Sequence, residues 1–216
     1  MSLNWREIEA VLAELNLEGC WLRKIRQPDY ARLILEFSRP GYSSALEIVM
    51  KAPFVRLNAI GEARRLPKAL PRPPRFTAVL KSRLQGARLR SLRQMGRDRI
   101  VRFSFGPDDD VLHLDAKLWG NGANLILSDD RGIIIDAFSR RPKRKEAPGE
   151  SWPPEGITAD PPSEAHGQTG MLPDDRFPLR DLPGVGSWNS RVETRYLALE
   201  AEEENRGRLT RWRNWL

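Results

Sequence analysis

Short apolar segments separated by turn residues constrain this 216-residue chain more than any other feature of its sequence. Most of the segments partly alternate between apolar and polar residues, and turn-forming stretches such as Gln27-Pro28-Asp29 and Arg39-Pro40-Gly41 bound them. This spacing predicts a meander of antiparallel strands. We expect two strands joined at Met95-Gly96, and further strands over residues 21–25, 32–37, 45–50, 55–60, 112–118, 125–127 and 133–137.

Three other segments carry apolar residues at helical spacing, so the expected fold class is α+β. The first covers residues 1–15, where Asn4 or Ser2 can act as the N-cap. A short helix is expected over residues 76–84. The last covers residues 188–216, with Asn189 or Ser190 as its cap.

A proline-rich stretch divides the chain. Residues 142–183 hold nine of the seventeen prolines and few large aliphatic residues, which favours a linker. We therefore expect a folded domain over residues 1–145, a linker over 146–187 and a C-terminal helix over 188–216. An apolar stripe on that helix either docks a protein partner or packs back onto the domain, and it consists of Leu209, Trp212, Trp215 and Leu216.

Positive charge is concentrated in one segment. The chain carries a net +7, but residues 64–102 contain thirteen Arg and Lys residues and one acid, so that segment alone carries +12. A second run, residues 140–145, has five cations in six positions. Guanidinium groups pair with phosphates and stack on exposed bases, so the pattern predicts an RNA-binding surface. The residues expected to line it are Lys81, Arg83, Arg88, Arg90, Arg93, Arg97, Asp98, Arg99, Arg102, Arg140 and Arg141.

Asp98 is the single carboxylate in that cationic segment. It either aligns Arg97 or Arg99 through a bidentate pair, or accepts hydrogen bonds from a ribose 2′-hydroxyl or a base amino group. The residues alone leave both roles open.

The sequence offers little for catalysis, so we expect no catalytic residue, no metal site and no cofactor. There are two histidines, His113 and His166, and one cysteine, Cys20, which rules out an intramolecular disulfide and favours a reducing compartment. No apolar run has the ~18 residues that a membrane-spanning helix needs. The expected location is the cytoplasm, with no membrane partner.

Several motifs, in order along the chain, resemble those of the NFACT family. The stretch from Phe76 to Arg88 is similar to the signature of its N-terminal domain, and residues 94–101, Gln-Met-Gly-Arg-Asp-Arg-Ile-Val, are similar to its glutamine and Asp-Arg motif. Residues 118–129 and 132–137 resemble a glycine-to-asparagine hairpin and its following strand. Pro148-Gly149 and Trp152-Pro153-Pro154 also stand where the family has such residues.

The resemblance implies a β-sandwich with flanking helices, like the N-terminal domain of Fpg/Nei DNA glycosylases. It implies a protein of ribosome-associated quality control that engages stalled large ribosomal subunits and tRNA without catalysis. The family's Asp-Arg motif, which is implicated in the tRNA role, falls here on Asp98 and Arg99.

The sequence also departs from the family pattern. A proline-rich linker stands where full members have a helix-hairpin-helix region, and Ala123 and Trp152 stand where serine and tyrosine are usual. Residues 187–199 resemble the start of the family's coiled-coil arm. Two alternatives remain: a DNA-binding or glycosylase-like protein of similar fold, which the N-terminal Met1-Ser2-Leu3-Asn4 disfavours, and a fibronectin-binding surface protein.

Overall fold

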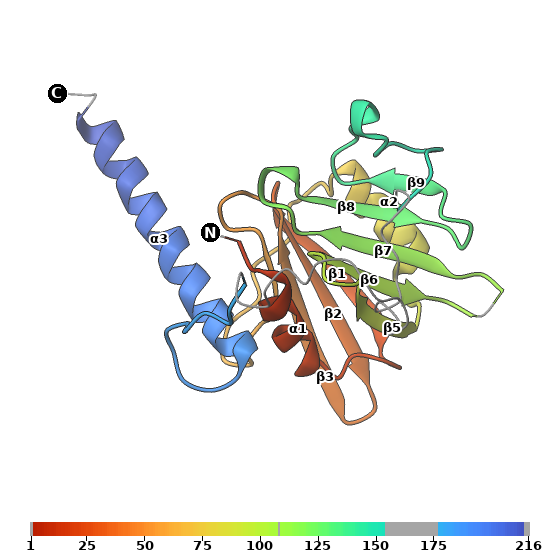
Figure 1. The fold of residues 1–216 in the computed structure, drawn as a ribbon, viewed down its shortest axis with the longest axis horizontal. Coiled ribbons are helices and arrows are strands. Elements are labelled where there is room, and N and C mark those ends of the chain that lie inside the picture. Colours follow the sequence, from red (N-terminus) through yellow and green to blue (C-terminus); the bar gives the residue numbers. More distant parts are fainter. Residues whose placement is uncertain (1, 108, 154–176, 214–216) are drawn as a thin grey trace, which may run out of the picture.

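The structure is a computed structural model that describes residues 2–107, 109–153 and 177–213. Its strands form two antiparallel sheets, each in sequence order (Figure 1). The first sheet consists of β1 (Trp21–Asp29), β2 (Arg32–Arg39), β3 (Tyr42–Val49) and β4 (Arg56–Ala59). The second consists of β5 (Leu89–Gln94), β6 (Ile100–Phe105), β7 (Leu112–Lys117), β8 (Asn124–Ser128) and β9 (Ile134–Ala137). Two short 3-10 helices accompany this sheet: η1 (Gly120–Gly122) connects β7 to β8, and η2 (Pro142–Arg144) follows β9.

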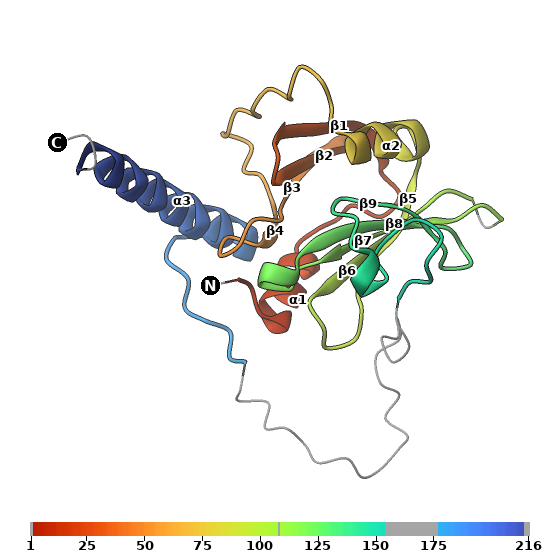
Figure 2. The same cartoon turned by 90° about the horizontal axis from the view of Figure 1, so that it is seen from above.

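The two sheets pack face to face around one hydrophobic core (Figure 2). Strand β6 shows why: Val101, Phe103 and Phe105 alternate along it, point to the same face and are fully buried. Phe105 stacks on Phe37 of the first sheet with ring centroids 6.4 Å apart. The predicted α+β class with mainly antiparallel strands is confirmed.

Helices cover the open sides of this sandwich. Helix α1 (Trp5–Ala13) begins at Asn4, whose side chain accepts a hydrogen bond from the backbone of Glu7 at 3.0 Å in a capping box. This helix contacts β4 and β5, while α2 (Arg75–Leu84) contacts β1 and β9. Of the two N-caps that the sequence allowed, the structure uses Asn4.

Helix α3 (Trp188–Arg213) begins differently from the prediction. The Ser187 hydroxyl, rather than Asn189 or Ser190, accepts a hydrogen bond from the first turn, from the Ser190 backbone N at 3.2 Å. The Asn189 side chain joins the helix to the domain instead, because its Oδ1 accepts from the backbone N of Ala59 at 2.6 Å and its Nδ2 donates to the carbonyl of Val11 at 3.0 Å.

The start of the expected linker packs on the second sheet. Trp152 is 3% exposed and lies in a small core on the outer face of that sheet. Its backbone N donates to the carbonyl of Gly132 at 2.7 Å, and its indole N donates to Asp115 at 2.7 Å. Residues 146–153 are therefore structurally continuous with the sheet, although the domain limits at 145 and 187 stay predictions.

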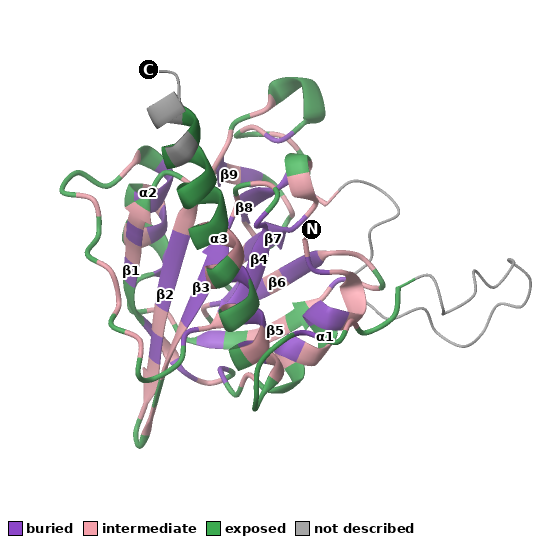
Figure 3. Cartoon of the chain, turned by 90° about the vertical axis from the view of Figure 1, so that its left-hand side faces the viewer, coloured by how far each residue is buried: buried purple, intermediate pink, exposed green. Residues whose placement is uncertain are grey.

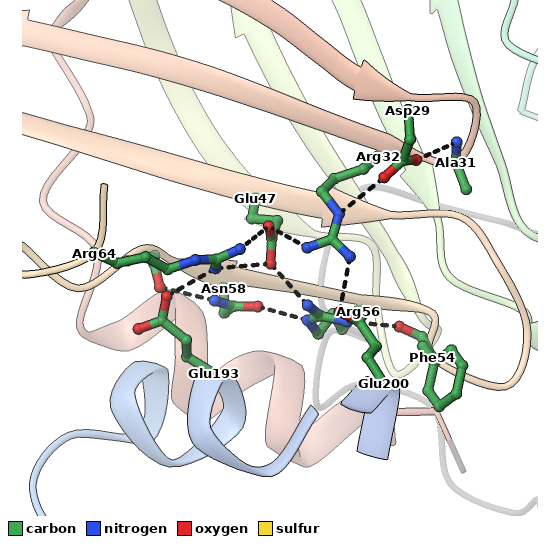
Figure 4. Close-up of polar contacts among 11 residues, drawn as sticks. Asp29, Ala31, Arg32, Glu47, Phe54, Arg56, Asn58, Arg64, Glu193 and Glu200 are labelled. Carbon is green, nitrogen blue, oxygen red and sulfur yellow. Dashed lines mark hydrogen bonds and ion pairs between the residues drawn. The ribbon is translucent and has the colours of Figure 1, made fainter. Parts of the chain in front are cut away.

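A buried ion network fixes the base of α3 against the outer face of the first sheet (Figure 4). The fully buried carboxylate of Glu47 on β3 contacts three guanidinium groups, at 2.8 Å from Arg32, 2.8 Å from Arg56 and 3.0 Å from Arg64. The helix completes the network with Glu193, 2.9 Å from Arg64, and Glu200, 2.6 Å from Arg56. We call these six residues the α3 clamp.

Beyond the clamp the helix leaves the domain. Its first turns bury Val192 and Tyr196, whereas residues 201–208 are exposed (Figure 3). The side chains of the predicted apolar stripe, Leu209, Trp212, Trp215 and Leu216, lie outside the described side chains, so the docking of a protein partner there stays a prediction.

The clamp makes stability depend on pH in a defined direction. Burial raises the pKa of Glu200, but Arg56 and Arg32 outweigh burial and hold that pKa below its ordinary value of 4.5. The ionised Glu200 therefore stabilises the fold at neutral pH, and this contribution is lost as the pH falls below 4.5. We expect Glu200→Gln to destabilise the protein at pH 7, with a smaller difference from the unchanged protein at pH 3.

Urea unfolding of both proteins across this pH range tests the expectation. The exposed Glu204→Gln serves as the control, with little difference at any pH. A Glu200→Gln difference that stays constant from pH 7 to pH 3 would contradict it.

Candidate nucleic-acid interface

The end of strand β5 and the turn after it carry four of the predicted RNA-binding residues, Arg93, Arg97, Asp98 and Arg99. This strand forms one edge of the second sheet, and α1 lies beside it. Arg93 and Arg97 are exposed. The guanidinium of Arg97 lies 5.6 Å from the ring centroid of Trp5, the first residue of α1, so a cation and an aromatic face share this part of the surface.

Asp98 organises the turn between β5 and β6. Its Oδ1 accepts hydrogen bonds from the backbone N of Arg99 at 2.5 Å and from the indole N of Trp119 at 2.8 Å. Its carbonyl accepts from the side chain of Gln94 at 2.8 Å. Within the described part of the chain the carboxylate pairs with neither the Arg97 nor the Arg99 guanidinium, which contradicts the bidentate role that the sequence left open.

Arg99 is oriented by the N-terminus rather than by Asp98. Its Nη1 donates to the Ser2 hydroxyl at 3.0 Å. The Oδ2 atom of Asp98 makes no hydrogen bond within the described ranges, so it remains available as an acceptor. The second role that the sequence allowed, acceptance from a ribose or base, therefore stays a prediction.

A pocket of about 480 Å³ opens at this turn, and we call it the Asp98 pocket. Its lining includes two aromatic residues, Trp5 and Phe177, and Phe177 is 49% exposed. Arg180 also lines it and pairs with the buried carboxylate of Glu7, whose hydrogen bond raises the pKa of Arg180 above its ordinary value. The lining residues are Ser2, Leu3, Asn4, Trp5, Arg97, Asp98, Arg99, Phe177, Pro178 and Arg180.

A second group of predicted residues lies at the other end of β5. Arg83 and Lys81 come from α2, Arg88 directly precedes β5, and Arg90 lies near the start of that strand. Arg83, Arg88 and Arg90 line a separate pocket of about 750 Å³. Arg90 and Arg93, the members of the two groups that are nearest along β5, are three residues apart, which is about 10 Å at ~3.3 Å per residue.

The remaining predicted residues are held in internal interactions. Arg102 makes a bidentate pair with the buried Asp115, at 2.9 and 2.7 Å. Arg140 donates to Asp136 at 3.0 Å, and Arg141 donates at 3.0 Å to each of the carbonyls of Gly122 and Ala123. These three guanidinium groups orient loops and strands of the second sheet, and their predicted contact with RNA remains untested.

Sequence reasoning missed three lining residues of the Asp98 pocket, Trp5, Phe177 and Arg180, and one hydrogen-bond partner of Asp98, Trp119. Trp5 falls in the helical pattern over residues 1–15, and Phe177 and Arg180 fall in the stretch predicted to be a linker. Trp119 falls in the motif over residues 118–129, and its hydrogen bond to Asp98 spans 21 residues. Only the aromatic character of Trp5 and Phe177 could have suggested a base-stacking surface.

Other chemistry is sparse in the described ranges. No group of three His, Cys, Asp or Glu residues there is placed to hold a metal ion. None of the helices in those ranges combines the length and apolar character needed to cross a membrane. His113 Nδ1 lies 3.1 Å from the Ser104 hydroxyl, and burial lowers the pKa of His113. The other histidine, His166, lies outside the described residues.

Comparison with known proteins gives matches over most of the chain. RqcH from Streptococcus suis is 32% identical over 176 residues, which covers 74% of this chain and 31% of RqcH. The human ribosome quality control complex subunit NEMF is 29% identical over 137 residues, covering 62% of this chain and 12% of NEMF. The chain thus spans less than a third of the length of these relatives.

A solved structure has the same fold. The N-terminal part of the fibronectin/fibrinogen-binding protein FBPS from Streptococcus suis superposes with a TM-score of 0.63 at 30% identity, covering 71% of this chain and 62% of that one. The sequence model described as "NFACT N-terminal and middle domains" matches residues 7–170, which include most of α1, both sheets and the Asp98-Arg99 turn. The chain therefore belongs to the NFACT family.

Proposed function

We propose that this protein binds RNA in ribosome-associated quality control and engages tRNA and the large ribosomal subunit. The observation that carries the proposal is the Asp98 pocket, where three guanidinium groups, two aromatic rings and a carboxylate oxygen line one cavity. The names of the relatives RqcH and NEMF support the cellular process. Because the chain spans under a third of their length, the proposal is limited to binding.

The chemistry of the pocket suits unpaired RNA. Arg97 and Arg99 supply fixed positive charge for backbone phosphates, since Trp5 and Ser2 hold them in place. Trp5 and Phe177 offer faces on which a splayed base can stack. The Oδ2 atom of Asp98 can accept a hydrogen bond from a ribose 2′-hydroxyl, the group that is present in RNA and absent from DNA.

The test compares two double variants that each remove two positive charges. Arg97→Ala/Arg99→Ala changes the pocket, whereas Arg131→Ala/Arg195→Ala removes exposed arginines from the β8–β9 turn and from α3. We expect the first to weaken binding of unfractionated tRNA about tenfold or more, and to reduce the salt slope by about 1 for each lost phosphate contact. The control is expected to bind within about threefold of the unchanged protein.

Fluorescence anisotropy at several salt concentrations measures both quantities. Equal weakening by the two double variants would mean that only overall charge matters, and would overturn the pocket as the RNA site. Immobilised fibronectin in the same assay tests the alternative that the name of FBPS suggests. Saturable fibronectin binding without tRNA binding would replace the present proposal.

A further inference from the structure

A second cavity lies where the two sheets meet, at the end of β5 far from the Asp98 pocket. It measures about 750 Å³, which is within the range of about 300–1,000 Å³ typical of ligand pockets. We call it the corner pocket. Its lining comes from Gly19, the end of α2, the start of β5 and the β6–β7 turn, and consists of Gly19, Arg83, Leu84, Ala87, Arg88, Leu89, Arg90, Phe105, Gly106, Pro107, Asp110 and Leu112.

Backbone hydrogen bonds fix the shape of this corner. Leu89 N donates to the carbonyl of Cys20 at 2.8 Å, and Gly19 N donates back to the carbonyl of Leu89 at 2.8 Å. Gly106 N donates to the carbonyl of Arg88 at 3.2 Å. Gly106 adopts a φ of +95°, and a Cβ there would lie 2.4 Å from the Asp110 carbonyl, so the turn requires glycine. The pocket walls are therefore preformed.

The floor of the corner pocket is apolar and its rim is cationic. Leu84, Leu89 and Phe105 are fully buried beneath it, and Ala87 and Leu112 are partly exposed along its sides. This surface matches the flat, weakly polar face of a nucleobase or another ring.

Two arginines on the rim differ in how they are held. Arg88 is oriented by its Nε, which donates to the carbonyl of Gly19 at 3.1 Å, and by Trp21, whose ring centroid lies 5.9 Å away. Within the described residues its terminal nitrogens donate no hydrogen bond, so they can donate to an anion. Arg83 is exposed at the last turn of α2 and has no ion pair within the described ranges. One preoriented and one adjustable guanidinium suit a phosphate group.

Asp110 also lines the pocket. A carboxylate can accept hydrogen bonds from sugar hydroxyls, as an acidic residue does for ribose in dinucleotide sites. We propose that the corner pocket binds a nucleoside phosphate. Arg83 and Arg88 contact the phosphate, Asp110 contacts the ribose, and the base lies against Ala87 and Leu112.

The nucleotide can be free or can be the 5′-terminal nucleotide of an RNA. Isothermal titration with AMP, inorganic phosphate, and a six-residue oligoadenylate with or without a 5′-phosphate distinguishes these sources. We expect saturable AMP binding that is at least about tenfold tighter than phosphate binding. A preference for the phosphorylated oligomer over the hydroxyl form would identify an RNA end, and binding of AMP alone would identify a free nucleotide.

Variants separate this site from the RNA site proposed above. Arg83→Ala removes one charge-assisted contact and is expected to weaken AMP binding about tenfold without changing the melting temperature, because Arg83 is exposed. Asp110→Asn is expected to reduce the preference for AMP over inorganic phosphate. The Arg97→Ala/Arg99→Ala protein should bind AMP normally, whether or not its tRNA binding changes. Absence of saturable binding up to millimolar AMP, phosphate binding as tight as AMP binding, or unchanged affinity in Arg83→Ala would overturn the proposal.

Discussion

Replacing Glu47 by glutamine is expected to lower the free energy of unfolding by about 3–5 kcal/mol. Glu47 is fully buried and contacts three guanidinium groups in the α3 clamp. Glutamine keeps the shape of the side chain but removes its charge, which leaves fully buried Arg56 with Glu200 as its only remaining acidic partner in the described ranges. Urea unfolding at pH 7 measures the change.

Glu36→Gln is the matched control for that experiment. Glu36 lies on the neighbouring strand β2 and pairs with Arg26, but its side chain is 25% exposed. Water screens such a pair, so the expected loss is about 1 kcal/mol or less. Similar losses in the two variants would show that burial of the clamp adds nothing to stability.

Replacing Trp152 by alanine is expected to cost about 3–5 kcal/mol of unfolding free energy. The indole is 3% exposed and packs with Met95, Ile100, Ile126 and Ile134 on the outer face of the second sheet. Its removal leaves a cavity and also deletes the hydrogen bond to Asp115. Calorimetry of the purified variant and of the unchanged protein measures the loss of unfolding free energy.

Two further variants separate these contributions. Trp152→Phe keeps most of the ring and should lose about 1–2 kcal/mol, because Arg102 still satisfies Asp115. Phe177→Ala, at a side chain that is 49% exposed, should change stability by about 0.5 kcal/mol or less. A Trp152→Ala protein as stable as the unchanged one would mean that residues 146–153 do not belong to the folded core.

The strands could be predicted from the sequence, but the packing of the segments that cover the sheets could not. Alternation along a strand such as β6 is a local signal, because one face of each sheet must be apolar. Trp152 has no such signal: its neighbours are prolines, glycine and acids, so composition predicts a linker, and only the fold brings it to Asp115, 37 residues away. The burial of Arg56 likewise has no local signal in the sequence, because its partner Glu200 is 144 residues away along the chain.

The candidate site, too, could be predicted only in part from the sequence. The excess of arginine over residues 64–102 predicts a cationic surface. It does not show which of these arginines form internal ion pairs with carboxylates. Arg102 and Arg99 both lie on or beside β6, yet Arg102 is paired with Asp115 and Arg99 lines a pocket. Cross-strand register decides this, because Arg102 stands opposite Asp115 in the β6–β7 ladder.

The α3 clamp also has a mechanical consequence. From Glu200 to Arg213 the helix extends about 20 Å at 1.5 Å per residue, without further support from the domain over its exposed residues 201–208 (Figure 1). It therefore acts as a lever that is held at its base by the clamp, by the buried side chains of Val192 and Tyr196 and by the hydrogen bonds of Asn189. A tilt of about 10° at the base moves the far end of such a 20 Å lever by about 3 Å, roughly the length of one hydrogen bond. The position of the helix tip is therefore more sensitive to the geometry of the contacts at the base than the position of any residue inside the clamp.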